Sequence, residues 1–529
     1  MNTFDIPTDL SEPLIATNAR INSGEISASG IKATERNANS STMTARAVRR
    51  FALPSCLLAA AALIVGAPSA RADSLQSAAG SGARWLAGDH HVHSHFSVGW
   101  DDQTDPPTPV LAGDAIYPIP VNAKMARRYG LSWMVSTDHG GPHHSKVNLE
   151  RAYPELLRSR AEVPEVVQFY GMELDTPGAD HSSLIMPHTR DEAERLYELE
   201  SHFAKFEPWP EDPAWDRESR MLDALRAMRA LPAPPLVIAN HPSRSATGLG
   251  KYDLDSPSEL RAWNDTAPEV AVGMEGAPGH QAMALRSDGS INAKGERGYY
   301  IDYPTHGGFD QMTARLGGFW DSMLGEGRRW WITADSDSHM HWTKDGGDFW
   351  PGEYSKTYVW ATPNHDAILT AIREGRVFVT TGDLISELDL VARAGGQEAR
   401  IGGSLAVARG ASVEVEIRFL DPTAKNHHGD DPSVQRVDLI GGNVTGPASK
   451  PDADTNSTTR VLARFVPKDW KRDGAYRVLT FRIENISAGA YLRVRGTNGS
   501  ELEPSPDPPG EDPWSDLWFY SNPIFLSVR

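Results

Sequence analysis

The stretch Gly88-Asp89-His90-His91-Val92-His93-Ser94 closes a segment that we predict to be the first β-strand of the fold. Side chains alternate along a strand, so His91 and His93 lie on the same side and both imidazoles can reach one ion. A His-x-His pair on its own is a weak metal signal, and an ordinary structural histidine is the alternative. The residues at the ends of the later strands decide between them.

The same residue types recur where other predicted strands end. Short apolar runs are followed by Thr137-Asp138-His139, Gly171-Met172-Glu173, Asn240-His241-Pro242, Glu275 and Asp335-Ser336-Asp337-Ser338-His339, and His181 opens the run 182–186. In a (β/α) barrel the ends of successive strands meet on one face, where catalytic residues gather. The recurrence therefore predicts a metal site built from imidazoles and carboxylates.

Each of these residues has a structural alternative. His241 before a proline is also typical of a turn, Glu173 of a buried paired carboxylate, and Glu275 of a structural carboxylate. For Asp138 we prefer a supporting role in which the carboxylate orients a neighbouring imidazole. We expect His143, His144, His280, His306 and His341 at the rim or in solvent, and His427-His428 in a surface loop.

The spacing of apolar residues predicts an α/β fold over 73–383 and a β-sandwich over 384–529. Strand-like runs such as 236–239 alternate with helical patterns such as Met221, Leu225 and Met228, which implies a parallel sheet or barrel. From about Leu384 the period becomes two, as in 413–417, and turn residues fill the gaps. Fifteen of the eighteen histidines lie between His90 and His341, so the chemistry belongs to the α/β part.

Composition restricts the ligands and the partners. The chain has 529 residues, a formal charge of −18 and one cysteine. A single cysteine builds neither a zinc finger nor an iron–sulfur site, so metal-binding histidines need carboxylate partners, and such sets suit Zn, Mn or Fe. The acidic balance argues against nucleic acid, because phosphate binding needs basic patches.

The first 72 residues resemble a targeting segment. Residues 1–42 are polar, and we interpret them as a disordered leader or as the result of a start assigned too far upstream. Residues 43–72 contain Arg46, Arg49 and Arg50, an apolar run over 51–67 and a small-x-small site at Ala70-Arg71-Ala72. This pattern predicts a signal peptide, and it is short for a membrane-spanning helix. We therefore expect a periplasmic or secreted protein without stable membrane insertion, with twin-arginine export as one route.

The ordered set of motifs resembles the polymerase-and-histidinol-phosphatase (PHP) superfamily, over roughly residues 83–381. The segment 367–382, with Glu374-Gly375-Arg376-Val377-Phe378-Val379-Thr380-Thr381-Gly382, further resembles its carbaryl-hydrolase-like branch. The resemblance implies a distorted (β/α)7 barrel that holds two or three divalent metal ions. It places the first ion on His91, His93, Glu173 and Asp337, the second on Glu173, His181 and His241, and a third on His139 and His339.

One part of the motif departs from that family. Ser-Asp-Gly usually comes after the His-x-His pair and helps to complete the third site, but this chain has Ser97-Val98-Gly99. His95, Asp101 and Asp102 are the substitutes that the sequence offers. An amidohydrolase relative is a further enzyme alternative, but its metals are normally bridged by a lysine where this chain has Glu173. No Gly-x-Ser-x-Gly elbow supports a serine hydrolase.

The leading functional hypothesis is an exported PHP-type phosphoesterase that uses a metal-bound hydroxide on a small-molecule ester. Arg244 is expected to bind an anionic group of the substrate, and His139 or His339 to protonate the leaving group.

Two alternatives stay open. One is a carboxyl-ester or carbamate hydrolase, which the carbaryl-hydrolase-like segment and the acidic charge favour. The other is a non-catalytic, metal-bearing binding protein whose β-domain contacts a partner protein or glycan through Trp514, Trp518, Phe519 and Tyr520, although such aromatics more often belong to a packed core.

Overall fold

The computed structural model describes residues 82–422 and 424–529, which belong to one compact unit. The predicted leader (1–42) and signal peptide (43–72) lie outside these described residues. Within them, no helix is both long and apolar enough to cross a bilayer.

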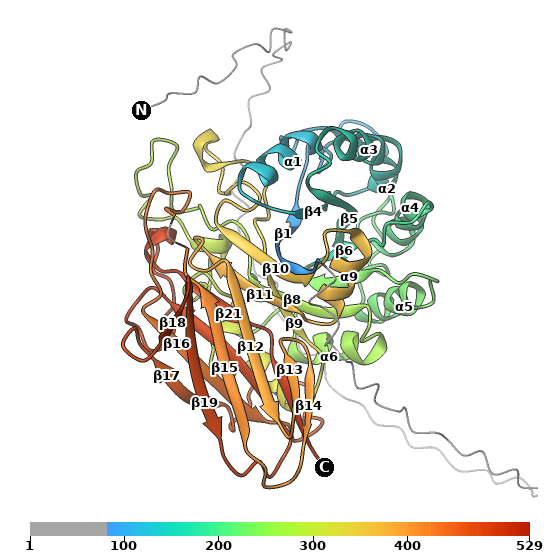
Figure 1. Ribbon diagram of the computed structural model, residues 1–529. Helices are drawn as coiled ribbons and strands as arrows, with labels where there is room; N and C mark the ends of the chain where they lie inside the picture. The colour runs from blue at the N-terminus through green and yellow to red at the C-terminus, as the bar shows by residue number, and fades with distance from the viewer. Residues whose placement is uncertain (1–81, 423) are drawn as a thin grey trace, which may run out of the picture. The chain divides into compact units, whose positions relative to one another are not determined.

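A large mixed sheet carries the predicted strand-end motifs (Figure 1). Its central strands are β1 (Arg84–Val92), β4 (Trp133–Ser136), β5 (Val167–Asp175), β6 (His181–Ile185), β7 (Leu236–Ala239), β8 (Ala271–Ala277) and β9 (Trp331–Ala334), in that spatial order. Strands β4 and β7 to β9 are buried along their whole length, as expected for strands covered on both faces. The α/β prediction is confirmed.

The sheet is not purely parallel. β1, β4 and β5 run parallel, as do β7, β8 and β9, but β6 is antiparallel to both of its neighbours. The turn 176–180, with Gly178 at φ +79, is too short for the crossover that a parallel connection needs. β10 (Ser355–Ala361) and β11 (Val377–Thr381) extend the other side in antiparallel fashion.

Helices lie around the outside of these strands (Figure 1). They are α1 (Ile119–Arg128), α2 (His144–Val147), the π-helix η2 (Asn148–Ala152), α3 (Tyr153–Glu162), α4 (Glu192–Phe203), α5 (Glu218–Arg229), α6 (Pro257–Thr266), α7 (Gln311–Ala314), α8 (Phe319–Gly325) and α9 (His365–Arg373). Met221, Leu225 and Met228 form the buried face of α5, as their spacing predicts. Short 3₁₀ turns occur at η3 (Arg297–Tyr299), η4 (Trp342–Lys344) and η5 (Pro513–Ser515).

The C-terminal strands form two layers. A separate antiparallel sheet has the order β13 (Gln397–Arg400), β12 (Glu387–Ala394), β15 (Val413–Leu420), β19 (Tyr476–Ile483), β18 (Lys471–Asp473). Val413, Val415, Ile417 and Phe419 of β15 are buried and the residues between them are not, which confirms the predicted alternation. Trp518, Phe519 and Tyr520 are fully buried, so they belong to the core and not to an exposed binding face.

The second layer is continuous with the large sheet. β21 (Trp518–Ser521) pairs with β11, and β20 (Ala490–Thr497), β22 (Ile524–Val528), β14 (Ser404–Val407), β16 (Arg436–Asn443) and β17 (Arg460–Phe465) lie further outward. The strands after Leu384 therefore complete the sheet that the α/β part begins.

Two local features place residues at the functional end of the sheet. Val92, at the end of β1, forms a parallel bridge with Ser338, which returns the segment after β9 to the side of β1. The hairpin of β2 (Gly99–Asp101) and β3 (Thr108–Val110) precedes a loop whose Ile116 N–H donates to the His339 carbonyl.

Candidate metal centre

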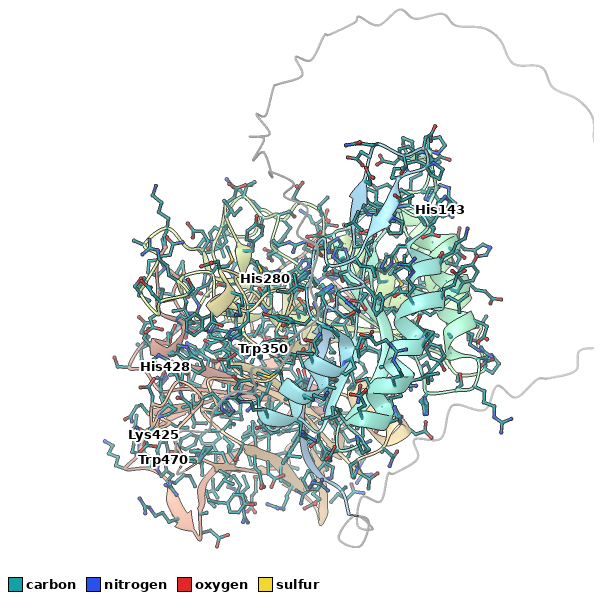
Figure 2. The ribbon with its side chains drawn as sticks, turned by 90° about the horizontal axis from the view of Figure 1, so that it is seen from above. His143, His280, Trp350, Lys425, His428 and Trp470 are labelled. Atoms are coloured by element: carbon teal, nitrogen blue, oxygen red, sulfur yellow. The ribbon has the colours of Figure 1, made fainter. Side chains whose placement is uncertain are left out.

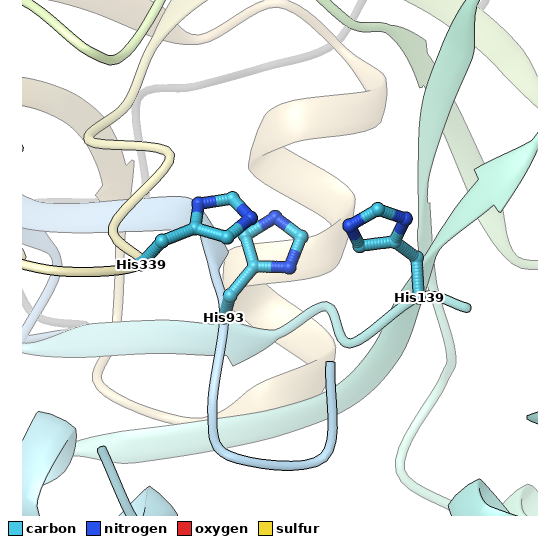
Figure 3. Close-up of side chains that lie close together, drawn as sticks. All are labelled: His93, His139 and His339. Carbon is cyan, nitrogen blue, oxygen red and sulfur yellow. The ribbon is translucent and has the colours of Figure 1, made fainter. Parts of the chain in front are cut away.

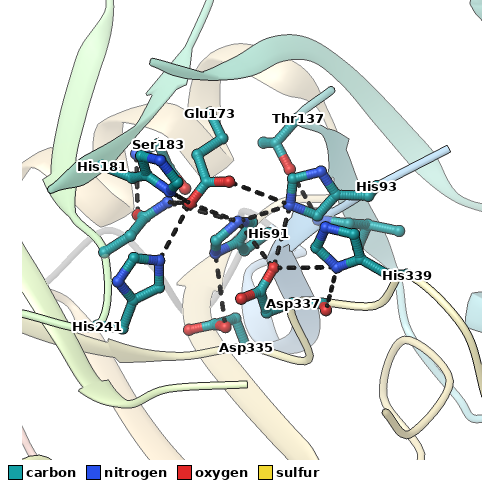
Figure 4. A network of polar contacts seen from close by, with 12 residues as sticks. His91, His93, Thr137, Glu173, His181, Ser183, His241, Asp335, Asp337 and His339 are labelled. Carbon is teal, nitrogen blue, oxygen red and sulfur yellow. Dashed lines mark hydrogen bonds and ion pairs between the residues drawn. The ribbon is translucent and has the colours of Figure 1, made fainter. Parts of the chain in front are cut away.

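The four residues predicted for the first ion converge on one point (Figure 4). The Nε2 atoms of His91 and His93 are 2.9 Å apart. Asp337 Oδ1 lies 3.1 and 3.0 Å from these two nitrogens, and the Glu173 carboxylate lies 3.2 and 3.4 Å from them. All four residues are at most 2% exposed.

The surroundings of both imidazoles leave lone pairs facing that point. His91 Nδ1 lies 2.7 Å from Glu275 Oε1, and His93 Nδ1 lies 2.8 Å from Ser97 Oγ, whose own hydroxyl donates to Asp138. Each Nδ1 therefore carries the hydrogen, which makes Nε2 an acceptor in the neutral ring. Asp138 acts on His93 through Ser97, in line with the supporting role we expect for it.

Two acceptor nitrogens at 2.9 Å, with two carboxylates beside them, need a positive charge between them. A divalent ion fits this donor set, because imidazole and carboxylate are the ligands that Zn, Mn and Fe take. The buried Asp337 Oδ1 also has no hydrogen-bond donor among the described residues. The residues present thus fit a divalent metal.

The second predicted group forms on the other side of Glu173. Glu173 Oε1 lies 3.0 Å from His181 Nδ1 and 3.2 Å from His241 Nε2. The remaining ring nitrogens face carboxylates, His181 toward Asp175 at 3.5 Å and His241 toward Asp180 at 3.3 Å. Glu173 stands between the two groups and contacts histidines of both (Figure 4).

A third group contains a residue that the sequence did not indicate. The rings of His93 and His339 stack at 3.8 Å, with His139 on the other side of His93 (Figure 3). Asp114 Oδ2 lies 3.1 Å from His139 Nε2 and 3.2 Å from His339 Nε2. Of the substitutes that the sequence offers, His95 instead faces Glu155 at 3.2 Å, and Asp101 belongs to β2.

Burial and neighbouring charge shift the pKa values in this cluster in opposite directions. Burial alone would lower the pKa of His91, but the charges of Asp337, Glu173 and Glu275 raise it well above its ordinary value. Burial, with the nearby charge of His339, lowers the pKa of His93 well below it. A proton on His91 thus takes the place of a cation, so metal binding would release it and would weaken in acid.

Arg244 lies at the edge of the second group. Its guanidinium donates to Asp180 Oδ1 at 3.2 Å, and its side chain is 22% exposed. Because Asp180 also contacts His241, Arg244 presents a positive charge beside that histidine.

The expectation of rim or solvent positions is wrong for several histidines. His144, His306 and His341 are buried, and hydrogen bonds to nearby groups offset the cost of burying their rings, as from His144 to Glu200 and from His341 to Glu353. His280 contacts Asp337 directly, at 2.9 Å. His428, in contrast, is 47% exposed, as predicted (Figure 2).

Sequence reasoning left the role of Glu275 open and missed two further supporting residues, Asp175 and Asp114. Glu275, left open as structural, binds His91 Nδ1 and accepts the backbone N–H of His241 at 2.5 Å. Asp175 comes two positions after Glu173 on the same strand, so alternation was a usable signal for it. Asp114 lies in an irregular loop between β3 and α1, where no periodicity marks it.

Comparison with known proteins adds no assignment. No protein-family model matches this chain, and a search of curated proteins finds no match. What the site does is therefore inferred from its geometry.

Proposed function

We propose that the chain is a metal-dependent hydrolase of the PHP superfamily and that it acts as a phosphoesterase on small-molecule esters. The observation that carries this proposal is the 2.9 Å separation of the His91 and His93 Nε2 atoms, both facing Glu173 and Asp337. The proposal includes the distorted (β/α)7 barrel, the exported location and the signal peptide that the sequence predicts.

The residues fit two positions that share Glu173 and a third that Asp114 completes. His91, His93, Glu173 and Asp337 would hold the first ion, Glu173, His181 and His241 the second, and His139, His339 and Asp114 the third. Divalent ions in such positions supply Lewis acidity and lower the pKa of coordinated water.

The protein's own groups then bind and protonate the substrate. Arg244 is positioned to hold an anionic oxygen of the substrate near His241. His139 and His339 are 22% and 16% exposed, whereas His91 and His93 are completely buried, so only the first pair can meet a leaving group arriving from solvent. Either imidazole can deliver a proton to the leaving oxygen when it is not engaged by an ion.

The test begins with the metal content of the purified protein. Parallel assays with phosphomonoester, phosphodiester, carboxyl-ester and carbamate chromogens then identify the bond that is cleaved. The double variant His91→Ala/His93→Ala should lose bound metal and lower kcat/KM by about 10³-fold or more.

The matched control replaces two exposed histidines, His188→Ala/His202→Ala, and should keep the bound metal and the kcat/KM of the wild type. A wild-type protein that binds no metal, or a double variant with full activity, would contradict the hydrolase proposal. Cleavage of only the carboxyl-ester or carbamate chromogens would replace the phosphoesterase assignment.

A further inference from the structure

His280 lies between two carboxylates at the edge of the metal centre (Figure 2 marks its position). Its Nε2 is 2.9 Å from Asp337 Oδ2, and its Nδ1 is 2.5 Å from Asp348 Oδ1. Both ring nitrogens therefore face a carboxylate oxygen within hydrogen-bonding distance, which fixes the ring between the two acidic side chains.

This arrangement divides the two oxygens of Asp337 between different tasks. Oδ2 accepts from His280, whereas Oδ1 faces His91 and His93 at 3.1 and 3.0 Å. Asp337 can therefore offer one oxygen to an ion in the first position.

Asp348 links the same ring to the loop of the third position. Its Oδ2 accepts the backbone N–H groups of His339 and Met340 at 2.7 and 2.9 Å. A continuous chain of contacts thus runs from the backbone of His339 through Asp348 and His280 to Asp337.

The backbone is built for this contact at a conformational cost. His280 and Asp337 have positive φ values of 54° and 45°, which residues other than glycine rarely adopt. At Gly279 a Cβ would lie 2.2 Å from the Cβ of Asp337, so only glycine permits this approach. Two strained residues that touch at the site indicate a functional constraint.

We propose that His280 is a positioning residue that holds Asp337 in its single-oxygen orientation and so sets the affinity of the first metal position. This inference rests on the proposed function only in taking Asp337 as a ligand. Loss of comparable contacts behind metal ligands weakens metal affinity by about 10- to 100-fold.

The experiment titrates metal-free protein with Zn²⁺ against a competing chelator and measures bound ions per chain. His280→Asn suits the backbone, because asparagine tolerates positive φ, but its side chain is too short to span both carboxylates. We expect one bound ion to weaken by about 10- to 100-fold. Asp337→Asn should weaken the same ion, which identifies the position.

The matched control is His341→Gln. His341 is another buried histidine with a carboxylate partner, Glu353 at 2.9 Å, but it contacts none of the predicted ligands. It should bind Zn²⁺ as the wild type does, and a Co²⁺-loaded sample should keep its absorption spectrum, whereas His280→Asn should change that spectrum.

Unchanged Zn²⁺ affinity and Co²⁺ spectrum in His280→Asn, or the same weakening in His341→Gln, would overturn the proposal. If His280→Asn shows no cooperative unfolding transition, Asp348→Asn decides, because it removes the negative charge beside His280 Nδ1 and keeps the side-chain shape. Metal binding by a wild type that cleaves none of the chromogens removes the hydrolase proposal and leaves this inference standing.

Discussion

The first and second groups of the centre differ from the third in how the fold supplies their side chains. His91, Glu173 and His181 come from strands β1, β5 and β6, and both imidazoles contact the Glu173 carboxylate. The third group takes Asp114 from an irregular loop, and that side chain is 43% exposed. Strand ends thus give a rigid and enclosed set of donors, whereas the loop gives a donor that solvent reaches.

The largest effect should come from removal of the carboxylate that joins the first two groups. Glu173→Gln deletes the charge between His91, His93, His181 and His241, so we expect loss of both ions and a fall in kcat/KM of about 10³-fold or more. Metal analysis and the chromogen that wild type cleaves provide the measurement.

Glu192→Gln is the control, because Glu192 is equally buried but pairs with Arg160 in another part of the fold. If Glu173→Gln keeps both ions, then Glu173 does not join the first and second groups. The contrast between one shared buried centre and a separate third group would then be wrong.

The segment that follows His139 and contains His144 should make the unfolding free energy of the protein depend on pH. Burial alone would lower the pKa of His144, but the charge of Glu200 at 2.6 Å raises it to about 9. This stabilisation is fully present below about pH 6.5 and is lost as the pH rises through 9, a change of about 3 kcal/mol in unfolding free energy.

Denaturant unfolding between pH 6.5 and 9.5 measures this change. His144→Gln should be less stable at pH 6.5, and its unfolding free energy should change less between these pH values than that of the wild type does, whereas the exposed His202→Gln should behave as the wild type does. A pH dependence in His144→Gln as large as that of the wild type would refute the role of the His144–Glu200 pair.

Asp114→Asn separates the third group from the other two. We expect one ion to be lost or weakened and kcat/KM to fall by about 10- to 100-fold, a smaller effect than at Glu173, because the first two groups stay intact. Asp101→Asn, on the hairpin before the same loop, should change neither quantity. Loss of all ions in Asp114→Asn would show that the three groups form one cooperative unit.

The smallest effect is expected at Ser97, which fixes His93 indirectly. Ser97→Ala removes the acceptor of His93 Nδ1–H, and we expect metal affinity to fall by about tenfold. Ser97→Thr keeps the hydroxyl and should restore most of that affinity. Equal affinities in wild type and Ser97→Ala would exclude a role for Asp138 in orienting the imidazole.

Much of this centre was predictable because strand geometry is periodic. The motifs at the ends of β1, β5, β7 and β9 are enough to place His91, Glu173, His241 and Asp337 on one face. Asp114 and His280 were not predictable in this way, because their positions depend on irregular loops and on close backbone approach at Gly279. The antiparallel direction of β6 likewise depends on one tight turn.

The pairing of β11 with β21 has a consequence for how the protein is made. β11 ends at Thr381, but its antiparallel partner begins at Trp518, so the ribosome must add the whole intervening chain before this edge is covered. Until then β11 presents unpaired backbone groups, which is the condition under which strands of different chains associate. A chain cut after Thr381 would keep that edge permanently, and we therefore expect such a fragment to aggregate during expression while the full-length protein does not.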